Sequence, residues 1–285
     1  MSMRVASLHI YPLKSGRGIN LDQADVALTG LSGDRRLMLT GPDGHFITQR
    51  ELPALARISV SQTPDETRLT FDDGRMVAFQ GNGHSRMDVA VWKSIVNAAT
   101  VDPEVDTALS EWLGRPVRLA VFDAQASRFT SRDWPGAETP VTFADGYQIL
   151  VTTTASLDAL NADMEKHGEG SVGMDRFRPN IVIDQDVPFA EDGWAAIDIG
   201  GLRFDLVKPC ARCVMTTQDQ ATGSREGANP MPAMGRLRFS TDRRVPGPIF
   251  GWNAVPRGCG TIRTGDEVRI VETNDARWPL KPPRD

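Results

Sequence analysis

The chain has 285 residues, of which 40% are hydrophobic, and it carries a formal net charge of −5. This length and apolar content are enough for one large or two modest buried cores, and they argue against a disordered protein. The acidic balance gives no general attraction to nucleic acid or to an anionic membrane, so we expect neither as a partner. Any binding of anions must therefore depend on a local cluster of basic side chains.

The N-terminal stretch MSMRVASLHIYPLKSG lacks the apolar segment that follows a basic head in a secretory signal. No run of about 18 apolar residues occurs in the sequence, so we expect no membrane-spanning helix. Three cysteines cannot form an even disulfide framework, which favours free thiols or metal ligands in a reducing compartment. These features together predict a cytoplasmic protein.

The first part of the chain has the pattern of short strands joined by tight turns. The runs VASLHIY, RLMLT, HFITQ, RLTF and MVAF alternate in polarity or contain β-branched residues, and GPDG and DDG suit turns with positive φ. A helix is expected over DPEVDTALSEWLG, with Asp102 as its N-cap, Pro103 in its first turn and Gly114 at its end. We therefore predict a β-rich N-terminal domain at residues 1–120.

The rest of the chain contains one more helix and then further strands. ASLDALNADMEKHG places Leu157, Leu160 and Met164 on one helical face before Gly168. Strands are expected in PNIVID, in AAIDIGGLRFDLV with Gly200–Gly201 as a hairpin turn, and in GTIRTGDEVRIV. The loop SRDWPGAETP supports a seam near residues 120–130, which predicts a second domain at 121–275 and a loose tail at 276–285. The predicted fold class is mainly β with α, an α+β protein.

Two cysteines lie three positions apart in KPCARC, and several interpretations are open. A thioredoxin-type couple would stand beside a βαβ crossover, whereas here the β-like run VMTTQDQATG follows the motif. A structural zinc site needs four ligands, and Cys259 and four scattered histidines offer no paired spacing. Burial as a small hydrophobe is an alternative for Cys210 and Cys259. Cys213 differs because a guanidinium beside it, that of Arg212, favours the thiolate that binds metals.

Several motifs, spread along the chain, together resemble one family. They are YPLKSGRG, GDRRLML, FRPNIVI followed by FAEDGW, KPCARCVMTTQDQATG, FG and GTIRTGDEV. The sequence is similar to MOSC-domain proteins with an N-terminal MOSC β-barrel-type domain, the group that contains the mitochondrial amidoxime reducing component and its bacterial relatives. The resemblance runs from about residue 4 to residue 272. It implies a MOSC β-barrel domain packed against a β-rich MOSC-N domain, with a cofactor between them.

The resemblance implies a molybdenum cofactor, Mo-molybdopterin, with Cys213 as the protein's ligand to the metal. Asp145 is expected to take part in catalysis, by orienting the substrate or relaying a proton. Taken alone, Asp145 and the polar and basic residues named next are ordinary surface charges or turn formers. Their occurrence together with Cys213 favours a site. The further cofactor contacts that the resemblance implies are Lys14, Ser15, Arg35, Gly146, Tyr147, Arg178, Asn180, Arg212 and Asn253.

The implied activity is a molybdenum-dependent reduction that removes oxygen from N-hydroxylated substrates, namely amidoximes, hydroxylamines and N-hydroxylated bases. Bacterial relatives often carry a C-terminal ferredoxin domain, whose iron–sulfur cluster is bound by cysteines, but no cysteine follows Cys259 here. We therefore expect electrons from a separate donor, a ferredoxin-like protein, a flavoprotein or a haem protein. Two alternatives stay open: a non-catalytic carrier of the molybdenum cofactor, and a sulfur carrier with a persulfide on Cys213. A further hypothesis is that residues 224–248 recognise the electron donor through Arg225, Arg236, Arg238, Arg243 and Arg244.

Overall fold

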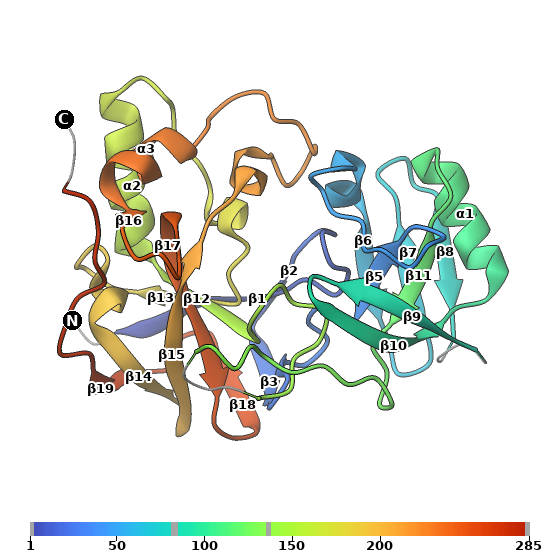
Figure 1. The fold of residues 1–285 in the computed structure, drawn as a ribbon, viewed down its shortest axis with the longest axis horizontal. Coiled ribbons are helices and arrows are strands. Elements are labelled where there is room, and N and C mark those ends of the chain that lie inside the picture. The colour runs from blue at the N-terminus through green and yellow to red at the C-terminus, as the bar shows by residue number, and fades with distance from the viewer. Residues whose placement is uncertain (1–2, 81–84, 135–137, 283–285) are drawn as a thin grey trace.

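The structure is a computed structural model that describes residues 3–80, 85–134 and 138–282. The chain forms two β-rich halves that lie side by side (Figure 1). One half is built around a nine-stranded sheet, and the other contains a four-stranded sheet, a three-stranded sheet and the first helix. The prediction of a mainly β fold with a few helices is confirmed.

The nine-stranded sheet has the order β19-β14-β15-β17-β12-β13-β1-β2, with β16 paired to β17. Neighbouring strands are antiparallel except β12 and β13, which are parallel. The strands are β1 (Arg4–Ile10), β2 (Ile19–Leu21), β12 (Ile149–Thr153), β13 (Ile181–Asp184), β14 (Trp194–Ile199), β15 (Leu202–Ala211), β16 (Phe239–Ser240), β17 (Gly247–Pro256) and β19 (Val268–Thr273).

A three-stranded sheet, β18-β3-β4, belongs to the same half. It consists of β3 (Gln23–Ala27), β4 (Gly30–Leu31) and β18 (Gly260–Arg263). Strands from the beginning of the chain therefore pair with strands of the last third, β1 with β13 and β3 with β18. The boundaries 1–120 and 121–275 remain a proposal, and these pairings tie the first 31 residues to the second half of the chain.

The other half contains the sheets β5-β11-β10-β9 and β6-β7-β8. The first is formed by β5 (Leu37–Thr40), β9 (Arg86–Val91), β10 (Ser94–Thr100) and β11 (Arg118–Val121), and the second by β6 (Ser59–Gln62), β7 (Thr67–Thr70) and β8 (Met76–Phe79). Leucine, isoleucine, valine and phenylalanine side chains from both sheets and from α1 (Pro103–Leu113) share one buried cluster. Apolar alternation along short strands thus produces this second core.

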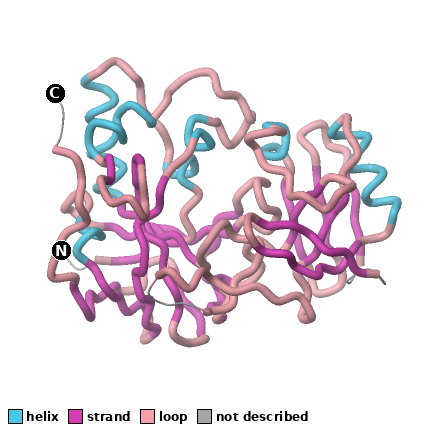
Figure 2. The backbone as a smooth tube through the Cα atoms, in the orientation of Figure 1, coloured by secondary structure: helices cyan, strands magenta, loops and turns pink. Residues whose placement is uncertain are grey.

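In the described residues, three α-helices and four 3₁₀ turns accompany the strands. Helices α2 (Thr154–Lys166) and α3 (Met231–Leu237) pack together on the large sheet, as Figure 2 shows. The 3₁₀ turns are η1 (Pro53–Arg57), η2 (Met174–Phe177), η3 (Ala190–Gly193) and η4 (Val214–Thr217). None of the helices in the described part of the chain is long and apolar enough to cross a membrane.

The two predicted helices are confirmed, and their ends follow from their sequences. Asp102 is at the N-cap of α1, and Gly114, with φ of 67°, ends it in the left-handed conformation that glycine adopts readily. In α2 the side chain of Thr153 accepts a hydrogen bond from the amide of Ser156. The predicted glycine hairpin is also confirmed, since Gly200 and Gly201 both have positive φ between β14 and β15.

The structure differs from the sequence predictions in three segments before the C-terminal tail. HFITQ makes only isolated bridges at His45 and Phe46, because the chain turns at Thr48, whose carbonyl accepts the amide of Leu52. The run after Cys213 is a 3₁₀ turn rather than β-like, and the hydroxyl of Thr216 donates to the carbonyl of Cys213 within it. Helix α3 was not predicted.

The segment expected as a loose tail is bound to β16 over its described residues. The indole of Trp278 donates to Ser240, and backbone hydrogen bonds join Thr241 to Pro279 and Lys281 to Phe239. The half-buried Trp278 thus fixes the C-terminal segment alongside β16. Residues 283–285 of the predicted tail lie outside the described residues.

Candidate functional site

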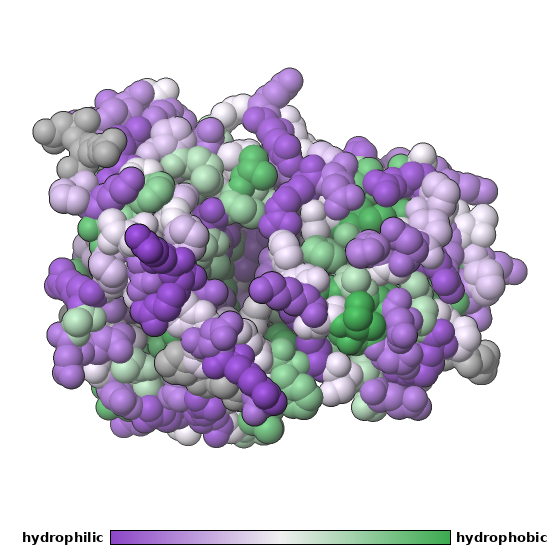
Figure 3. All heavy atoms as spheres, viewed as in Figure 1, coloured by the Kyte–Doolittle hydropathy of each residue, from purple (hydrophilic) through white to green (hydrophobic). Residues whose placement is uncertain are grey.

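A cavity of about 500 Å³ lies between the two halves, and the surface is hollowed there (Figure 3). Its walls include Thr48, Arg50 and Trp92 from one half and the segment 208–213 from the other. The structure brings together all of the predicted site residues in this cavity, namely Lys14, Ser15, Arg35, Asp145, Gly146, Tyr147, Arg178, Asn180, Arg212, Cys213 and Asn253. The cavity is therefore the candidate site.

The walls of this cavity are strongly basic, although the chain as a whole carries a net charge of −5. Asp145 is the single acidic residue among the described lining residues. Guanidinium and ammonium groups gathered in a concave surface attract anions such as phosphate. The basic lining residues are Lys14, Arg35, Arg50, Arg176, Arg178, Lys208 and Arg212.

Two of these arginines are held on the ring of Tyr11, which follows strand β1. The guanidinium carbons of Arg35 and Arg178 lie 4.3 and 4.1 Å from the ring centroid. Arg35 also donates to Asp34 at 2.6 Å and to Oδ1 of Asn180 at 3.1 Å. Burial lowers the pKa of Arg178 to about 10, so its guanidinium is still charged at neutral pH. The two cations are fixed before any ligand arrives.

Backbone strain is concentrated at the same place. Six described non-glycine residues have positive φ, and four of them line the cavity: Ser15 (67°), Arg35 (46°), Trp92 (55°) and Arg178 (53°). Each such conformation costs about 1 kcal/mol in a residue with a Cβ atom. Strained conformations cluster where function requires a particular side-chain direction, so this concentration supports a functional site.

Asp145 and Lys14 form an ion pair in the cavity. The ammonium of Lys14 also donates to the carbonyl of Phe143 at 2.9 Å, and the indole of Trp92 donates to Oδ1 of Asp145 at 3.2 Å. Burial acts to raise the pKa of Asp145, but the charge of Lys14 and these hydrogen bonds outweigh it and hold that pKa well below its ordinary range. Burial lowers the pKa of Lys14. Asp145 is therefore an ionised hydrogen-bond acceptor at neutral pH.

Cys213 lies just beyond strand β15, at the N-cap of η4, and its thiol faces an arginine from the other half of the molecule. A guanidinium nitrogen of Arg50 donates to its sulfur at 3.3 Å. Arg212, the cation expected beside Cys213, instead donates to the sulfur of Cys210 at 3.0 Å and to the carbonyl of Phe177 at 2.8 Å. Arg212 therefore contacts the sulfur of Cys210 rather than that of Cys213, because neighbouring side chains on extended backbone point to opposite sides.

A pair of buried glutamines fixes the segment that carries Arg50. The amide of Gln49 donates to the carbonyl of Ser15 at 2.8 Å and to Gln220 at 3.1 Å. Gln220 donates back to Gln49 at 3.3 Å, and its oxygen accepts a hydrogen bond from Arg178 at 2.9 Å. The two glutamines therefore join residues of both halves directly beneath the site.

Two buried polar atoms on the cavity walls have no hydrogen-bond partner among the described residues. They are the hydroxyl of Tyr147 and Nε of Arg212. Buried polar groups are normally paired, so these two atoms are exceptions among the described residues. The amide of Asn253 is already used, since it donates to the carbonyl of Lys208 at 3.2 Å.

Several residues of the site were missed by the sequence analysis. Tyr11 and Asp34 lie inside the motifs YPLKSGRG and GDRRLML, and their role as supports of the arginines was not recognised. Arg50 and Trp92 carry no local pattern that distinguishes them, because only the tertiary fold brings them to Cys213 and Asp145. In the described part of the chain, no three His, Cys, Asp or Glu side chains gather closely enough to bind a metal ion.

The basic loop at 224–248 is mostly neutralised. Arg236 pairs with Asp163 and Glu169, Arg238 with Asp192, and Arg244 with Asp242. Of the other two arginines, Arg225 donates to the carbonyl of Arg50 at 3.3 Å, and Arg243 is exposed. The structure thus leaves two of the five arginines without an acidic partner among the described residues, which weakens the idea of a basic docking surface.

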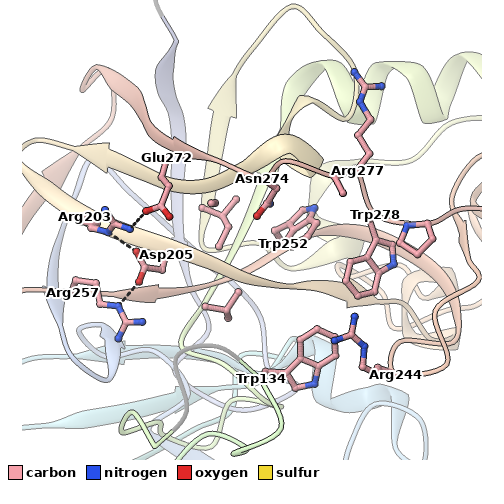
Figure 4. Close-up of a pocket in the computed structure, with 15 residues that line it drawn as sticks. Trp134, Arg203, Asp205, Arg244, Trp252, Arg257, Glu272, Asn274, Arg277 and Trp278 are labelled. Carbon is pink, nitrogen blue, oxygen red and sulfur yellow. Dashed lines mark hydrogen bonds and ion pairs between the residues drawn. The ribbon is translucent and has the colours of Figure 1, made fainter.

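A second cavity, of about 490 Å³, contains none of the predicted site residues. Figure 4 shows an aromatic side, where the guanidinium of Arg244 lies 4.9 Å from the ring of Trp134 and 5.6 Å from that of Trp278. Across the cavity from these rings, Asp205 accepts hydrogen bonds from Arg203 and Arg257 at 2.6 Å each. This cavity has aromatic and charged walls, and its charges are largely paired with one another.

Comparison with known proteins agrees with the geometry of the first cavity. The profile of the MOSC N-terminal beta barrel domain matches residues 2–116, and that of the MOSC domain matches residues 138–269. The chain is 30% identical to mitochondrial amidoxime-reducing component 1 from Homo sapiens, over 94% of this chain and 82% of that protein. For the protein of that name from Danio rerio the identity is 27%, over 93% of this chain and 83% of that protein.

A third relative is named molybdenum cofactor sulfurase and comes from Solanum lycopersicum. It is 26% identical over 93% of this chain, and the match covers 35% of its own length. The names of these relatives refer to molybdenum cofactor or to amidoxime reduction, and both matched domains contribute walls to the first cavity.

Proposed function

The chain belongs to the MOSC-domain family, together with the mitochondrial amidoxime-reducing components, and from this premise we propose that it is a molybdenum-cofactor-dependent reductase of N-hydroxylated compounds. One observation carries the proposal. A thiol, that of Cys213, opens into a cavity whose described lining residues include seven basic side chains and one acidic one. This combination suits a cofactor that has both a metal and an anionic phosphate.

The residues present fit such a group. The thiolate of Cys213 would be the metal ligand, and the hydrogen bond from Arg50 would stabilise its negative charge. Arg35 and Arg178, held on Tyr11, would bind the phosphate together with Ser15 and Asn180. The remaining predicted contacts, Lys14, Gly146, Tyr147, Arg212 and Asn253, would surround the pterin, where the hydroxyl of Tyr147 and Nε of Arg212 are unpaired.

The proposed reaction breaks the N–O bond of an amidoxime, a hydroxylamine or an N-hydroxylated base. Two electrons and two protons enter, and the amidine or amine and one water leave. The cofactor, when bound, would supply the two-electron redox chemistry. A separate donor protein would provide the electrons, and a ferredoxin-like protein, a flavoprotein or a haem protein each suits this role.

Asp145 would act by accepting hydrogen bonds from the substrate. Because its pKa is well below the ordinary range, it is ionised at neutral pH and has no proton to give. Its side chain is 65% exposed, and it opens into the cavity. Lys14, whose pKa is lowered by burial and which already donates to Asp145, is the better placed proton source of the two.

Two other functions would use the same thiol, a carrier that binds the cofactor without turnover and a persulfide carrier. The persulfide role has no need of Arg35, Arg178 and Asn180 as a phosphate site, so the basic walls favour the cofactor. The cytoplasmic location is also part of the proposal, while the names of several relatives refer to mitochondria.

The test is turnover with an artificial reductant. The protein would be purified from a host that makes the molybdenum cofactor, and benzamidoxime reduction would be followed with reduced methyl viologen. We expect benzamidine from the wild type and from Cys259→Ala, whose exposed thiol lies outside the cavity, and none from Cys213→Ala. A wild type that holds molybdenum but reduces no N-hydroxylated compound would favour the carrier instead.

A further inference from the structure

Trp92 occupies an unusual place in the fold. Ser94 pairs with Val91 in the hairpin of β9 and β10, so Trp92 and Lys93 form a two-residue turn. When the first of the two turn residues has a positive φ, glycine is favoured at that position, and Trp92 stands there with φ of 55°. The indole is 50% exposed, so burial does not account for a bulky aromatic residue in a strained position.

The indole stands at the wall of the candidate site rather than on open surface. Its N–H donates to Oδ1 of Asp145 at 3.2 Å, and its ring lies 5.1 Å from the ring of Phe46. The guanidinium carbon of Arg50 lies 5.4 Å from the indole ring, and the same guanidinium donates to the sulfur of Cys213 at 3.3 Å. One arginine side chain therefore spans the distance between the exposed indole and the thiol.

Asp145 has a free acceptor beside this ring. Lys14 and Trp92 both donate to its Oδ1 atom, and Oδ2 has no hydrogen-bond partner among the described residues. An exposed aromatic face next to a free carboxylate oxygen suits a flat π system that carries an N–H donor. Aromatic amidoximes and N-hydroxylated bases with an amino group have this chemistry, whereas small aliphatic amidoximes have the donor but no extended ring.

We propose that Trp92 determines substrate specificity, by packing against planar aromatic N-hydroxylated substrates whose amino group donates to Asp145. The inference rests on the proposed function and assigns different roles to the two halves of the molecule. The N-terminal half would select the substrate through the tip of the β9–β10 hairpin, and the other half would hold the metal through Cys213.

The experiment compares an aromatic with an aliphatic substrate in three variants. Trp92→Gly removes the ring and its contacts with Phe46, Arg50 and Asp145, while the relief of the positive φ offsets part of that loss, so the variant should fold with a Tm close to that of the wild type. Trp92→Phe keeps an aromatic face without the N–H group. Ile95→Ala removes another exposed apolar side chain of the same hairpin, outside the cavity. The ratio of kcat/KM for benzamidoxime to that for acetamidoxime would be measured with reduced methyl viologen.

In Trp92→Gly the ratio should fall about 2- to 10-fold, the size of an aromatic stacking contribution. Trp92→Phe should keep most of the ratio, and Ile95→Ala should leave it unchanged. An unchanged ratio in Trp92→Gly would overturn the inference. Equal loss with both substrates together with a lower Tm would also overturn it, since that result indicates a purely structural role.

A binding measurement separates this inference from the proposed function. Calorimetry on the cofactor-loaded protein without reductant would give the affinity for benzamidoxime and for acetamidoxime. We expect Trp92→Gly to weaken binding of benzamidoxime by the same factor and to leave that of acetamidoxime unchanged. If the wild type turned over neither compound, the proposed function would fail, and the calorimetric comparison would still decide the role of Trp92.

Discussion

The two cavities are almost equal in volume, about 500 and 490 Å³, but their charges are arranged differently. In the second cavity Arg203 and Arg257 are paired with Asp205, Arg203 also pairs with Glu272, and Arg244 pairs with Asp242. In the first cavity three of the seven basic lining residues are paired, Lys14 with Asp145, Arg35 with Asp34 and Arg176 with Asp219, and the other four have no acidic partner among the described residues. Volume alone would not tell the two apart.

The larger number of unpaired cations, rather than the volume, therefore distinguishes the first cavity as the place for an anionic ligand. Cations that lie close together repel one another, and a bound anion offsets that repulsion. Arg178 illustrates the arrangement, because it lies on the neutral ring of Tyr11 and has no acidic partner among the described residues. In the second cavity, by contrast, three of the four basic lining residues are paired with acids, so its residues are expected to contribute mainly to stability.

The largest expected effect follows from removing one cation from each cavity. Arg178→Gln should weaken cofactor binding about 10- to 100-fold, because a charge-assisted contact contributes that much. Arg257→Gln, in the second cavity, should leave cofactor affinity unchanged. The rate of cofactor release from purified protein would measure both. Equal release rates in the two variants would abolish the distinction between the cavities.

The reverse experiment removes an aromatic wall of the second cavity. Trp278→Ala should lower the free energy of unfolding by about 2 kcal/mol, less than for a fully buried tryptophan, because Trp278 is half-buried. Urea unfolding would measure it, with the exposed Arg277→Ala as a control that changes stability by less than about 0.5 kcal/mol. Loss of cofactor from Trp278→Ala at unchanged stability would contradict a structural role for this cavity.

Binding of inorganic phosphate tests the first cavity more specifically, and the expected change in stability is smaller. In cofactor-free protein, phosphate at ten times its dissociation constant should stabilise the fold by about 1.4 kcal/mol through mass action. The stabilisation should disappear in Arg35→Gln and persist in Arg203→Gln. Thermal unfolding at several phosphate concentrations would measure it. Equal stabilisation of both variants would mean that the anion binds elsewhere.

The smallest expected effect concerns pH. The pKa of Asp145 is lower in the folded protein than its ordinary value near 3.9, so its contribution to stability is present above that pH and is lost as the pH falls below it. Asp145→Asn should therefore lose less stability than the wild type between pH 5 and about pH 3. Urea unfolding across this range would show it, with the exposed Asp186→Asn as the matched control. Parallel curves for wild type and Asp145→Asn would contradict the ion pair with Lys14.

The residues that line the first cavity could be proposed from short motifs because those motifs resemble a known family. Ser15 in YPLKS, Arg35 in GDRR and Arg178 in FRPN each hold a positive φ that points the side chain into the cavity, and all three were found through those motifs. Helix α1 was equally predictable, since Pro103 and Gly114 determine its ends locally. Local chemistry was sufficient for the helix, whereas the three cavity residues were predicted from the family resemblance that their motifs carry.

Other parts depend on contacts between distant segments. Arg50 reaches Cys213 across 163 positions of sequence, and the glutamine pair beneath it joins residues 171 positions apart. The strand expected over HFITQ does not form, because Thr48 turns the chain toward the cavity instead. The tail was misjudged for the same kind of reason, since Trp278 finds its partner Ser240 only in the folded protein. Sequence patterns do not contain these pairings.

The central claim is that the basic cavity and its thiol bind a molybdenum cofactor. It is tested most directly by measuring molybdenum and released pterin in protein purified from a host that makes the cofactor, for the wild type, Cys213→Ala and Cys259→Ala. We expect about one molybdenum and one pterin per chain in the wild type and in Cys259→Ala, and loss of the metal in Cys213→Ala. No molybdenum in any of the three proteins, with zinc or a persulfide on Cys213 instead, would contradict the claim.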